Sequence, residues 1–283
     1  TPADQPAITA FLEARAERAM FPLANLANHG MQGGHDRAMS FWLSHTDGTL
    51  TNVLAITDEG MVMPACPSGN WPAAAAALAG RRIAGVIGPA EQARPLIQAL
   101  GLREAATKLD DDDPQFSLPL SALRIPDGPG TIVPLADAPE ATMRAWMLDY
   151  QRNTLGTPLE EAKWRVDESY TSYCAQNSHM ALVDAGKPLS ITGFNARFGD
   201  IVQIGGVYTP PELRSRGHAR RAVALHLQQA AAEGITRATL FAAAENAVRA
   251  YRAIGFEPIG RWTLMLLAQT QLLAQTQKAQ THG

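Results

Sequence analysis

The chain has 283 residues, of which 46% are hydrophobic and 18% are charged, and its formal net charge is −3. This length predicts two domains or one large one, and the hydrophobic content is sufficient for ordinary cores, so a disordered chain is excluded. The slightly acidic balance argues against a nucleic-acid-binding protein, because such proteins usually present a strongly basic face.

The two cysteines, Cys66 and Cys174, are far apart and lack the spacing of a metal or redox motif. This argues against a disulfide scaffold and a zinc module, so we expect no metal. No apolar run reaches transmembrane length, and no secretory signal is visible. We therefore expect a cytoplasmic protein that has no membrane or nucleic-acid partner.

In the first half, the apolar spacing predicts a helix at residues 7–20, followed by a loop at 21–30. Two strand-like runs at 40–43 and 50–56 flank Asp47-Gly48, which is typical of a hairpin turn. The later elements predicted in this half are an alanine-rich helix at 71–78, a buried strand at 82–87, a helix at 89–100 and a strand at 117–124.

The run Asp110-Asp-Asp-Asp113 has two interpretations, a solvated loop or an edge that attracts a cation or an amine. After it, Pro126-Asp-Gly-Pro-Gly130 is the strongest break in the sequence. We expect the domain boundary there.

The second half is predicted to alternate strands and helices. The expected strands are 131–134, 179–183, 188–195, 201–207, 237–242 and 260–267, and the expected helices are 138–153, 160–173, 220–233 and one around residues 246–251. The remaining residues, 268–283, are rich in Gln, Ala and Thr and read as a low-complexity tail.

The turn between the predicted strand at 201–207 and the helix at 220–233 carries the pattern Arg214-x-x-Gly217-x-Ala219. Backbone N–H groups at a helix start form a concave anion site, to which the helix dipole adds partial positive charge. Gly217 has no Cβ to obstruct a ligand that approaches the main chain. Four arginines, Arg214, Arg216, Arg220 and Arg221, surround it. The ligand indicated is a phosphate or a pyrophosphate.

With the following strand and the segment from Asn246 through Tyr251 to Phe256, this region resembles the GNAT superfamily of acetyl-CoA-dependent N-acyltransferases. The resemblance covers residues 201–266 and is thin elsewhere. It implies an α/β fold (α+β type) with a mixed, mostly antiparallel twisted sheet flanked by helices. The domains expected are an N-terminal α/β domain at 1–128, an acetyltransferase domain at 129–267 and the tail at 268–283.

The resemblance also implies where coenzyme A binds: its pyrophosphate at the turn, and its pantetheine arm along the strand end near Val207, whose N–H is directed at the thioester carbonyl. The cofactor-binding residues expected are Gly206, Val207, Tyr208, Arg214, Ser215, Arg216, Gly217, His218, Ala219, Arg220, Asn246 and Tyr251.

Tyr251 is the expected general acid, because a phenol with an ordinary pKa of about 10 keeps its proton at neutral pH and can give it to a departing thiolate. Asn246 is expected to cap the helix that carries Tyr251. A general base is not evident, because the strand at 201–207 contains no acidic residue. The candidates are Asp200 as a tentative base, a carboxylate of the helix at 160–168, a water relay placed by Gln203, or an amine that arrives neutral.

The sequence therefore predicts an acetyl-CoA-dependent N-acetyltransferase that acts on a primary amine of a small molecule or amino-acid-like acceptor, as a monomer or a homodimer. The alternatives are a non-catalytic acyl-CoA-binding or sensing protein, a structural partner, and an acyltransferase for a longer acyl-CoA. Because Ala84 to Pro89 followed by a helix loosely resembles residues 206–210 followed by a helix, the first half is either a degenerate copy of the second or an unrelated α/β domain.

Overall fold

The computed structural model of the chain describes residues 1–242 and 244–274, which form two compact units. The first unit contains Thr1–Asp113 and residues 260–274, and the second contains Pro114–Ile259. The predicted break at 126–130 lies inside the second unit, because the Arg221 guanidinium binds the carbonyl oxygens of Pro126, Pro129 and Gly130.

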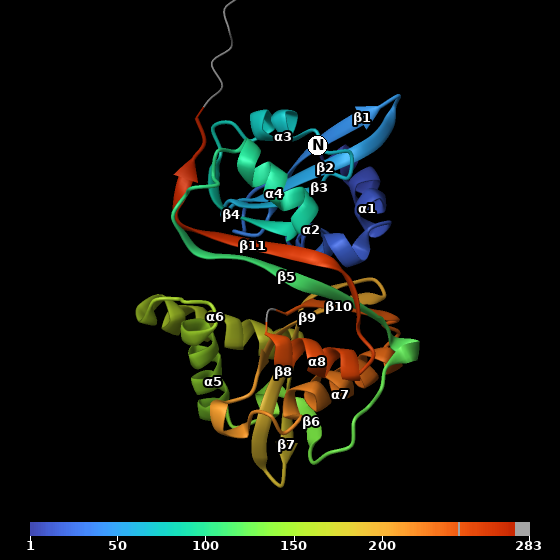
Figure 1. The fold of residues 1–283 in the computed structure, drawn as a ribbon, viewed down its shortest axis with the longest axis vertical. Coiled ribbons are helices and arrows are strands. Elements are labelled where there is room, and N and C mark those ends of the chain that lie inside the picture. The colour runs from blue at the N-terminus through green and yellow to red at the C-terminus, as the bar shows by residue number, and fades with distance from the viewer. Residues whose placement is uncertain (243, 275–283) are drawn as a thin grey trace, which may run out of the picture. The chain divides into compact units, whose positions relative to one another are not determined.

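The first unit is a five-stranded sheet with four helices. Its elements are α1 (Gln5–Glu13), α2 (Ala16–His29), β1 (Met39–Thr46), β2 (Thr49–Thr57), β3 (Met61–Ala65), α3 (Trp71–Ala77), β4 (Arg82–Pro89), α4 (Ala90–Ala99) and the later strand β11 (Glu257–Leu272). The strand order is β1-β2-β3-β4-β11, and only β3 and β4 are parallel (Figure 1). As predicted, Asp47-Gly48 turns the β1–β2 hairpin, with both residues at positive φ.

The second unit is a six-stranded sheet with four helices. Its elements are the end of β5 (Thr107–Pro119, of which the residues up to Asp113 belong to the first unit), β6 (Thr131–Pro134), α5 (Glu140–Asn153), α6 (Leu159–Gln176), β7 (His179–Asp184), β8 (Lys187–Phe198), β9 (Ile201–Tyr208), α7 (His218–Ala232), β10 (Arg237–Phe241) and α8 (Glu245–Ala253). The strand order is β5-β10-β9-β8-β7-β6, and only β9 and β10 are parallel. The expected mixed, mostly antiparallel sheet flanked by helices is confirmed.

Helices cover both faces of the second sheet. Because successive side chains of a strand point to opposite faces, one strand contributes to the packing on both. Phe194 of β8 packs with Val202, Ile204 and the apolar side of α7 and α8. Ile191, three residues earlier, packs on the other face with Met143 of α5 and Tyr170 of α6. β8 therefore separates two cores.

Each unit is completed by a strand from the opposite end of the sequence. β10 pairs through Phe241↔Gln115 to Arg237↔Pro119 with the end of β5, although β5 belongs to the first half of the chain. Correspondingly, β4 pairs with β11, the expected last strand of the second half, from Pro89↔Trp262 to Arg82↔Leu272. Because of this exchange, the chain passes from one unit to the other at two places, between residues 113 and 114 and between residues 259 and 260.

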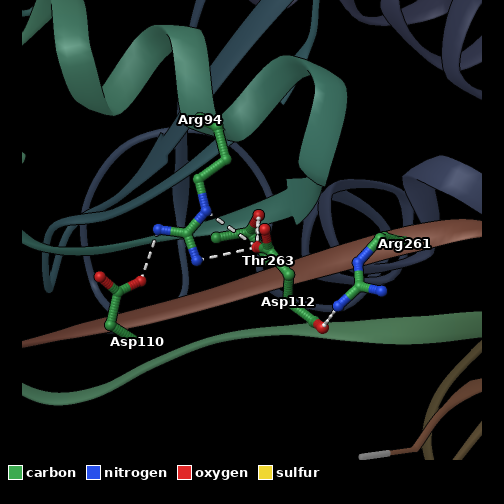
Figure 2. A network of polar contacts seen from close by, with 5 residues as sticks. All are labelled: Arg94, Asp110, Asp112, Arg261 and Thr263. Carbon is green, nitrogen blue, oxygen red and sulfur yellow. Dashed lines mark hydrogen bonds and ion pairs between the residues drawn. The ribbon is translucent and has the colours of Figure 1, made fainter.

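The acidic run lies within β5, so its prediction as a solvated loop is wrong. Figure 2 shows Asp110 and Asp112 directed at the guanidinium of Arg94 on α4, with N···O distances of 2.6 and 2.8 Å. Thr263 of β11 donates to Asp112 at 2.6 Å. Burial raises the pKa of Asp112, but Arg94 and Thr263 outweigh it and hold that pKa below its ordinary value. Half of the run is therefore committed to internal ion pairs.

Two other expectations are corrected. The predicted loop at 21–30 is helical, because non-helical φ and ψ at Ala19 interrupt α2 and the helix starts again, which leaves Pro22 near a helix start where proline is tolerated. The tail expected from Ala268 is strand as far as Leu272, and residues 275–283 lie outside the described residues.

The strand exchange predicts which fragments fold. We expect a fragment of residues 114–259 to unfold cooperatively. A fragment of residues 129–259 should not, because it lacks the end of β5, which contributes Phe116 and Leu118 to the core. Losing two such core side chains costs about 2–5 kcal/mol each, against a typical domain stability of about 5–15 kcal/mol. Thermal melts followed by circular dichroism measure this. Equal melting of both fragments would contradict the pairing of β5 with β10.

Candidate functional site

The end of β9 carries a β-bulge. β8 and β9 pair Gly193 with Gly205 and then Ile191 with Tyr208, so β9 contains one residue more than β8 over this stretch. Gly206 lies in the bulge at a φ of 62°, a conformation that residues with a Cβ rarely adopt. A bulge leaves its extra residue out of the ladder, so backbone groups of this segment are free to bind a ligand.

On its other side, β9 pairs with β10 only near its start. The parallel register runs from Ile201↔Arg237 to Gln203↔Thr239 and goes no further among the described residues. Both strands continue beyond this point, β9 to Tyr208 and β10 to Phe241. The end of β9 is thus interrupted on the β8 side by the bulge and, among the described residues, unpaired on the β10 side.

Tyr208 anchors the end of β9. Its hydroxyl donates to Asp149 of α5 at 2.5 Å, and Ser190 donates its hydroxyl to the Tyr208 carbonyl oxygen at 2.9 Å. Burial raises the pKa of Tyr208 to about 12, and the bond to Asp149 adds to this effect. Tyr208 therefore holds the strand in place through its side chain.

The predicted anion turn leads directly into α7. Gly217 is the N-cap at a φ of 84°, and Ser215 is also at positive φ, at 63°. The first backbone hydrogen bond of the helix runs from the Arg221 N–H to the Gly217 carbonyl oxygen at 3.1 Å. The preceding N–H groups, of His218 to Arg220, have no intrahelical acceptor, as at any helix start, and Gly217 has no side chain to cap them.

The four arginines of the turn differ in role. Arg214 donates to the Thr209 carbonyl oxygen at 2.9 Å, and Arg221 holds the loop at 126–130. Arg216 is exposed. The Nε of Arg220 is buried near Gly217 with no hydrogen-bond partner among the described residues. Arg216 and Arg220 are thus the cations left for an anion at the turn.

His218, at the start of α7, is buried. Burial lowers its pKa, and Arg216 adds to the effect. Its imidazole is accordingly held neutral, so it contributes its backbone N–H at the turn and no positive charge. Ala219, next to it, has a partly exposed surface and no functional side chain.

Tyr251 lies in α8 and is largely buried, with its ring edge-on to Phe256 at 6.0 Å between centroids. Burial raises its pKa, and Tyr150 of α5 raises it further. The pKa of Tyr150 is in turn raised to about 12, by burial and by Tyr173 of α6. Tyr150 is therefore close enough to affect Tyr251 and to be affected by Tyr173.

Two predicted residues lie in unexpected places. Asn246 is the second residue of α8, whose N-cap is Ala244, and its Oδ1 accepts from the adjacent Ala247 N–H at 2.9 Å. Asp200 precedes β9, at the opposite end of the strand from the bulge. It accepts hydrogen bonds from Thr236 and from Arg237, which keep its pKa below the ordinary range.

The other acidic candidates face solvent. On α6, Glu160 and Glu161 pair with Lys163 and Arg165 at 2.8 and 3.0 Å, and Glu168 is exposed. In β9, the Gln203 side chain is buried, and its Oε1 has no hydrogen-bond partner within the part of the chain that the structure describes. An amide cannot take up the proton of an amine, so Gln203 is no substitute for a carboxylate.

The sequence interpretation did not single out His179, the first residue of β7. It is 2% exposed, and its ring stacks on that of Tyr173 at 3.5 Å between centroids. Its register partner is Gly193, and Gly206 of the bulge lies beside it. Glycines inside strands often mark a close approach by another group. That signal, at Gly193 and Gly205-Gly206, was available in the sequence.

One family model and several solved structures are similar to this chain. Residues 140–256 match the family model of the acetyltransferase (GNAT) family. A GCN5-related N-acetyltransferase from Sphaerobacter thermophilus is 15% identical over 97% of this chain and 94% of that one, with a TM-score of 0.57. A GCN5-related N-acetyltransferase from Kribbella flavida is 18% identical over 77% and 87%, with a TM-score of 0.52.

An X-ray structure of a Drosophila protein is 13% identical over 94% of this chain and 97% of that one, with a TM-score of 0.64. A search of curated proteins gave no match. No helix among residues 1–242 and 244–274 is long and apolar enough to cross a membrane. In the same residues, no group of three His, Cys, Asp or Glu side chains lies together as a metal site requires.

The buried histidines predict acid sensitivity. Burial lowers the pKa of His179 and of His226 to about 3, from 6.5. The unfolded chain takes up these protons below about pH 6.5, but the folded protein does so only near pH 3. The free energy of unfolding is therefore highest above pH 6.5 and falls as the pH is lowered toward 3. The loss reaches about 1.4 kcal/mol per pH unit for each histidine. Urea unfolding between pH 7.5 and pH 4 measures it.

We expect His226→Phe, which keeps a ring stacked on Phe194, to reduce this pH dependence. Replacement of the exposed His45 by Gln serves as the matched control and should leave it unchanged. A wild-type slope in His226→Phe would show that His226 is protonated in the folded protein.

Proposed function

We propose that residues 140–256, which match the family model of the acetyltransferase (GNAT) family, form an acetyltransferase domain, and that the protein transfers the acetyl group of acetyl-CoA to a primary amine of a small-molecule acceptor. The observation that carries the proposal is the bulge of β9 at Gly206, where an unpaired strand edge runs toward the anion turn of α7. We propose this edge for the pantetheine arm and this turn for the pyrophosphate.

The turn supports binding of a pyrophosphate. The first-turn N–H groups of α7 are uncapped, and an anion there gains from their hydrogen bonds and from the helix dipole. The buried Arg220 Nε lacks a partner among the described residues, which an anion at the turn would supply. A Cβ at Gly217 would lie 3.1 Å from this Nε, so a side chain there would compete for the same space.

The reaction needs no covalent enzyme intermediate. The neutral amine nitrogen attacks the thioester carbonyl carbon, and a C–N bond forms while the carbonyl oxygen gains negative charge. Backbone N–H groups of the bulge, at Gly206 and Val207, are suited to stabilise this oxygen; one such donor is typically worth about 2.7–4 kcal/mol. The C–S bond then breaks, and the sulfur takes a proton.

We assign this proton to Tyr251. Burial raises its pKa, so the phenol is protonated at neutral pH and has a proton to give when a thiolate forms beside it. The tyrosinate regains a proton, directly or through water, from the nitrogen that made the attack. Protons therefore balance within one turnover.

We propose that solvent is the base that deprotonates the acceptor's ammonium group before the acceptor binds. Asp200 and the acidic residues of α6 are already paired or exposed, as described above, and β9 has no carboxylate. The amine would then bind in its neutral form, so kcat/KM should rise with pH up to the pKa of the acceptor amine. A small-molecule acceptor is preferred here, and a panel of small amines against lysine-containing peptides tests that preference.

Replacement of Tyr251 tests the mechanism. We expect Tyr251→Phe to lower kcat by about 10²–10⁴-fold, the usual contribution of a general acid, and to leave acetyl-CoA affinity nearly unchanged. Release of free CoA thiol measures the rate. Tyr170→Phe, which removes the hydroxyl of another buried tyrosine of the same unit, is the matched control and should stay within a few-fold of wild type.

An unchanged kcat in a folded Tyr251→Phe protein would remove Tyr251 from the reaction. Acetyl-CoA binding without turnover across the amine panel would instead favour the alternative of an acyl-CoA-binding protein without catalysis.

A further inference from the structure

The two nitrogens of the His179 imidazole have different surroundings. Its Nδ1 lies 3.0 Å from the hydroxyl of Ser178. Its Nε2 is buried and has no hydrogen-bond partner among the residues that the structure describes. A buried polar group without a partner costs about 1–3 kcal/mol, so such a group commonly has a function that explains its retention.

The free nitrogen is directed at the bulge of β9. A Cβ on Gly206 would lie 3.0 Å from Nε2, and a Cβ on Gly193 would lie 2.1 Å from both Nε2 and Cδ2. The ring thus occupies space that side chains at both positions would fill. Stacking on Tyr173, with an interplanar angle of 10°, keeps the ring from turning away. His179 is held with one unpaired nitrogen beside the bulge.

The protonation state follows from the same surroundings. Burial lowers the pKa of His179 to about 3, with a further contribution from His226, so the ring is neutral at physiological pH. If the Ser178 hydroxyl donates to Nδ1, the single ring proton must be on Nε2. A neutral ring with this tautomer presents an N–H to the bulge.

We propose that the Nε2–H of His179 donates a hydrogen bond to the thioester carbonyl oxygen of acetyl-CoA and, with the backbone N–H of the bulge, stabilises the negative charge that develops there. This rests on the proposed function. No proton is transferred by this step: His179 stays neutral throughout, and Ser178 acts as a positioning residue that selects the tautomer. A ring that binds a proton so weakly is poorly suited to be the base, which agrees with assigning it a donor role.

Two variants separate donation from packing. His179→Phe keeps a stacked ring without the N–H, and His179→Gln places an amide N–H₂ near the position of Nε2. We expect kcat to fall by about 10²–10³-fold in His179→Phe, the effect of losing one oxyanion donor, with a much smaller loss in His179→Gln. The KM for acetyl-CoA should change little in either variant.

Infrared spectroscopy of bound acetyl-CoA labelled with ¹³C at the carbonyl carbon provides a readout that a purely structural role would not move. The carbonyl stretch should shift to lower frequency in the wild type, keep part of that shift in His179→Gln and lose it in His179→Phe. Thermal melts and calorimetric binding of acetyl-CoA establish that each variant is folded and occupied.

The outcomes are distinguishable. Absence of acetyl-CoA binding by the wild type would overturn the proposed function itself. Wild-type turnover by His179→Phe, together with a carbonyl stretch at the same frequency as in the wild type, would overturn only the role of His179. If His179→Phe fails to fold, ¹⁵N NMR of the wild-type complex decides, because a proton on Nδ1 would contradict the proposal and a proton on Nε2 would support it.

Discussion

The unpaired backbone at the end of β9 is the constraint on which this account depends. A strand inside a sheet normally has its N–H and C=O groups satisfied on both sides. Here the bulge at Gly206 disrupts the ladder with β8, and the ladder with β10 ends at Gln203. Bonds from Tyr208 to Asp149 and Ser190 hold the segment in this conformation. The fold thus stabilises a strand end whose backbone groups are available to a ligand.

The second element is a set of aromatic rings in the same unit. Tyr150, Tyr173 and Tyr251 come from three helices, and His179 adds a ring from β7. Burial raises the pKa of Tyr150 and of Tyr251 and lowers that of His179, so these three groups are uncharged at neutral pH. Positive charge is concentrated instead at the turn of α7, where Arg216 and Arg220 remain for a phosphate.

Local patterns in the sequence predicted most elements of the second unit, because each strand and helix there has a clear period and turn residues at its ends. The turn at Gly217 and the helix that carries Tyr251 were found in this way, and both lie within the residues that match the acetyltransferase (GNAT) family model. Asn246 as an N-cap was wrong by two positions, since the helix begins one residue earlier than the asparagine.

Non-local features were missed. The exchange of β5 and β11 between the units depends on pairing between residues more than 100 apart, which no local pattern encodes. The acidic run reads as a loop until Arg94 of α4 is seen to pair with it. His179 sits in an ordinary apolar strand, and only its proximity to Gly193 and Gly206 shows what is unusual about it.

Calorimetric titration of the wild type with acetyl-CoA tests the central claim most directly. The account predicts one site per chain, and it predicts that Gly217→Glu loses this site while the protein stays folded, because a carboxylate would then occupy the anion turn. Two sites per chain, or full binding by folded Gly217→Glu, would contradict the placement of the cofactor at α7. No binding by the wild type would contradict the acetyltransferase function altogether.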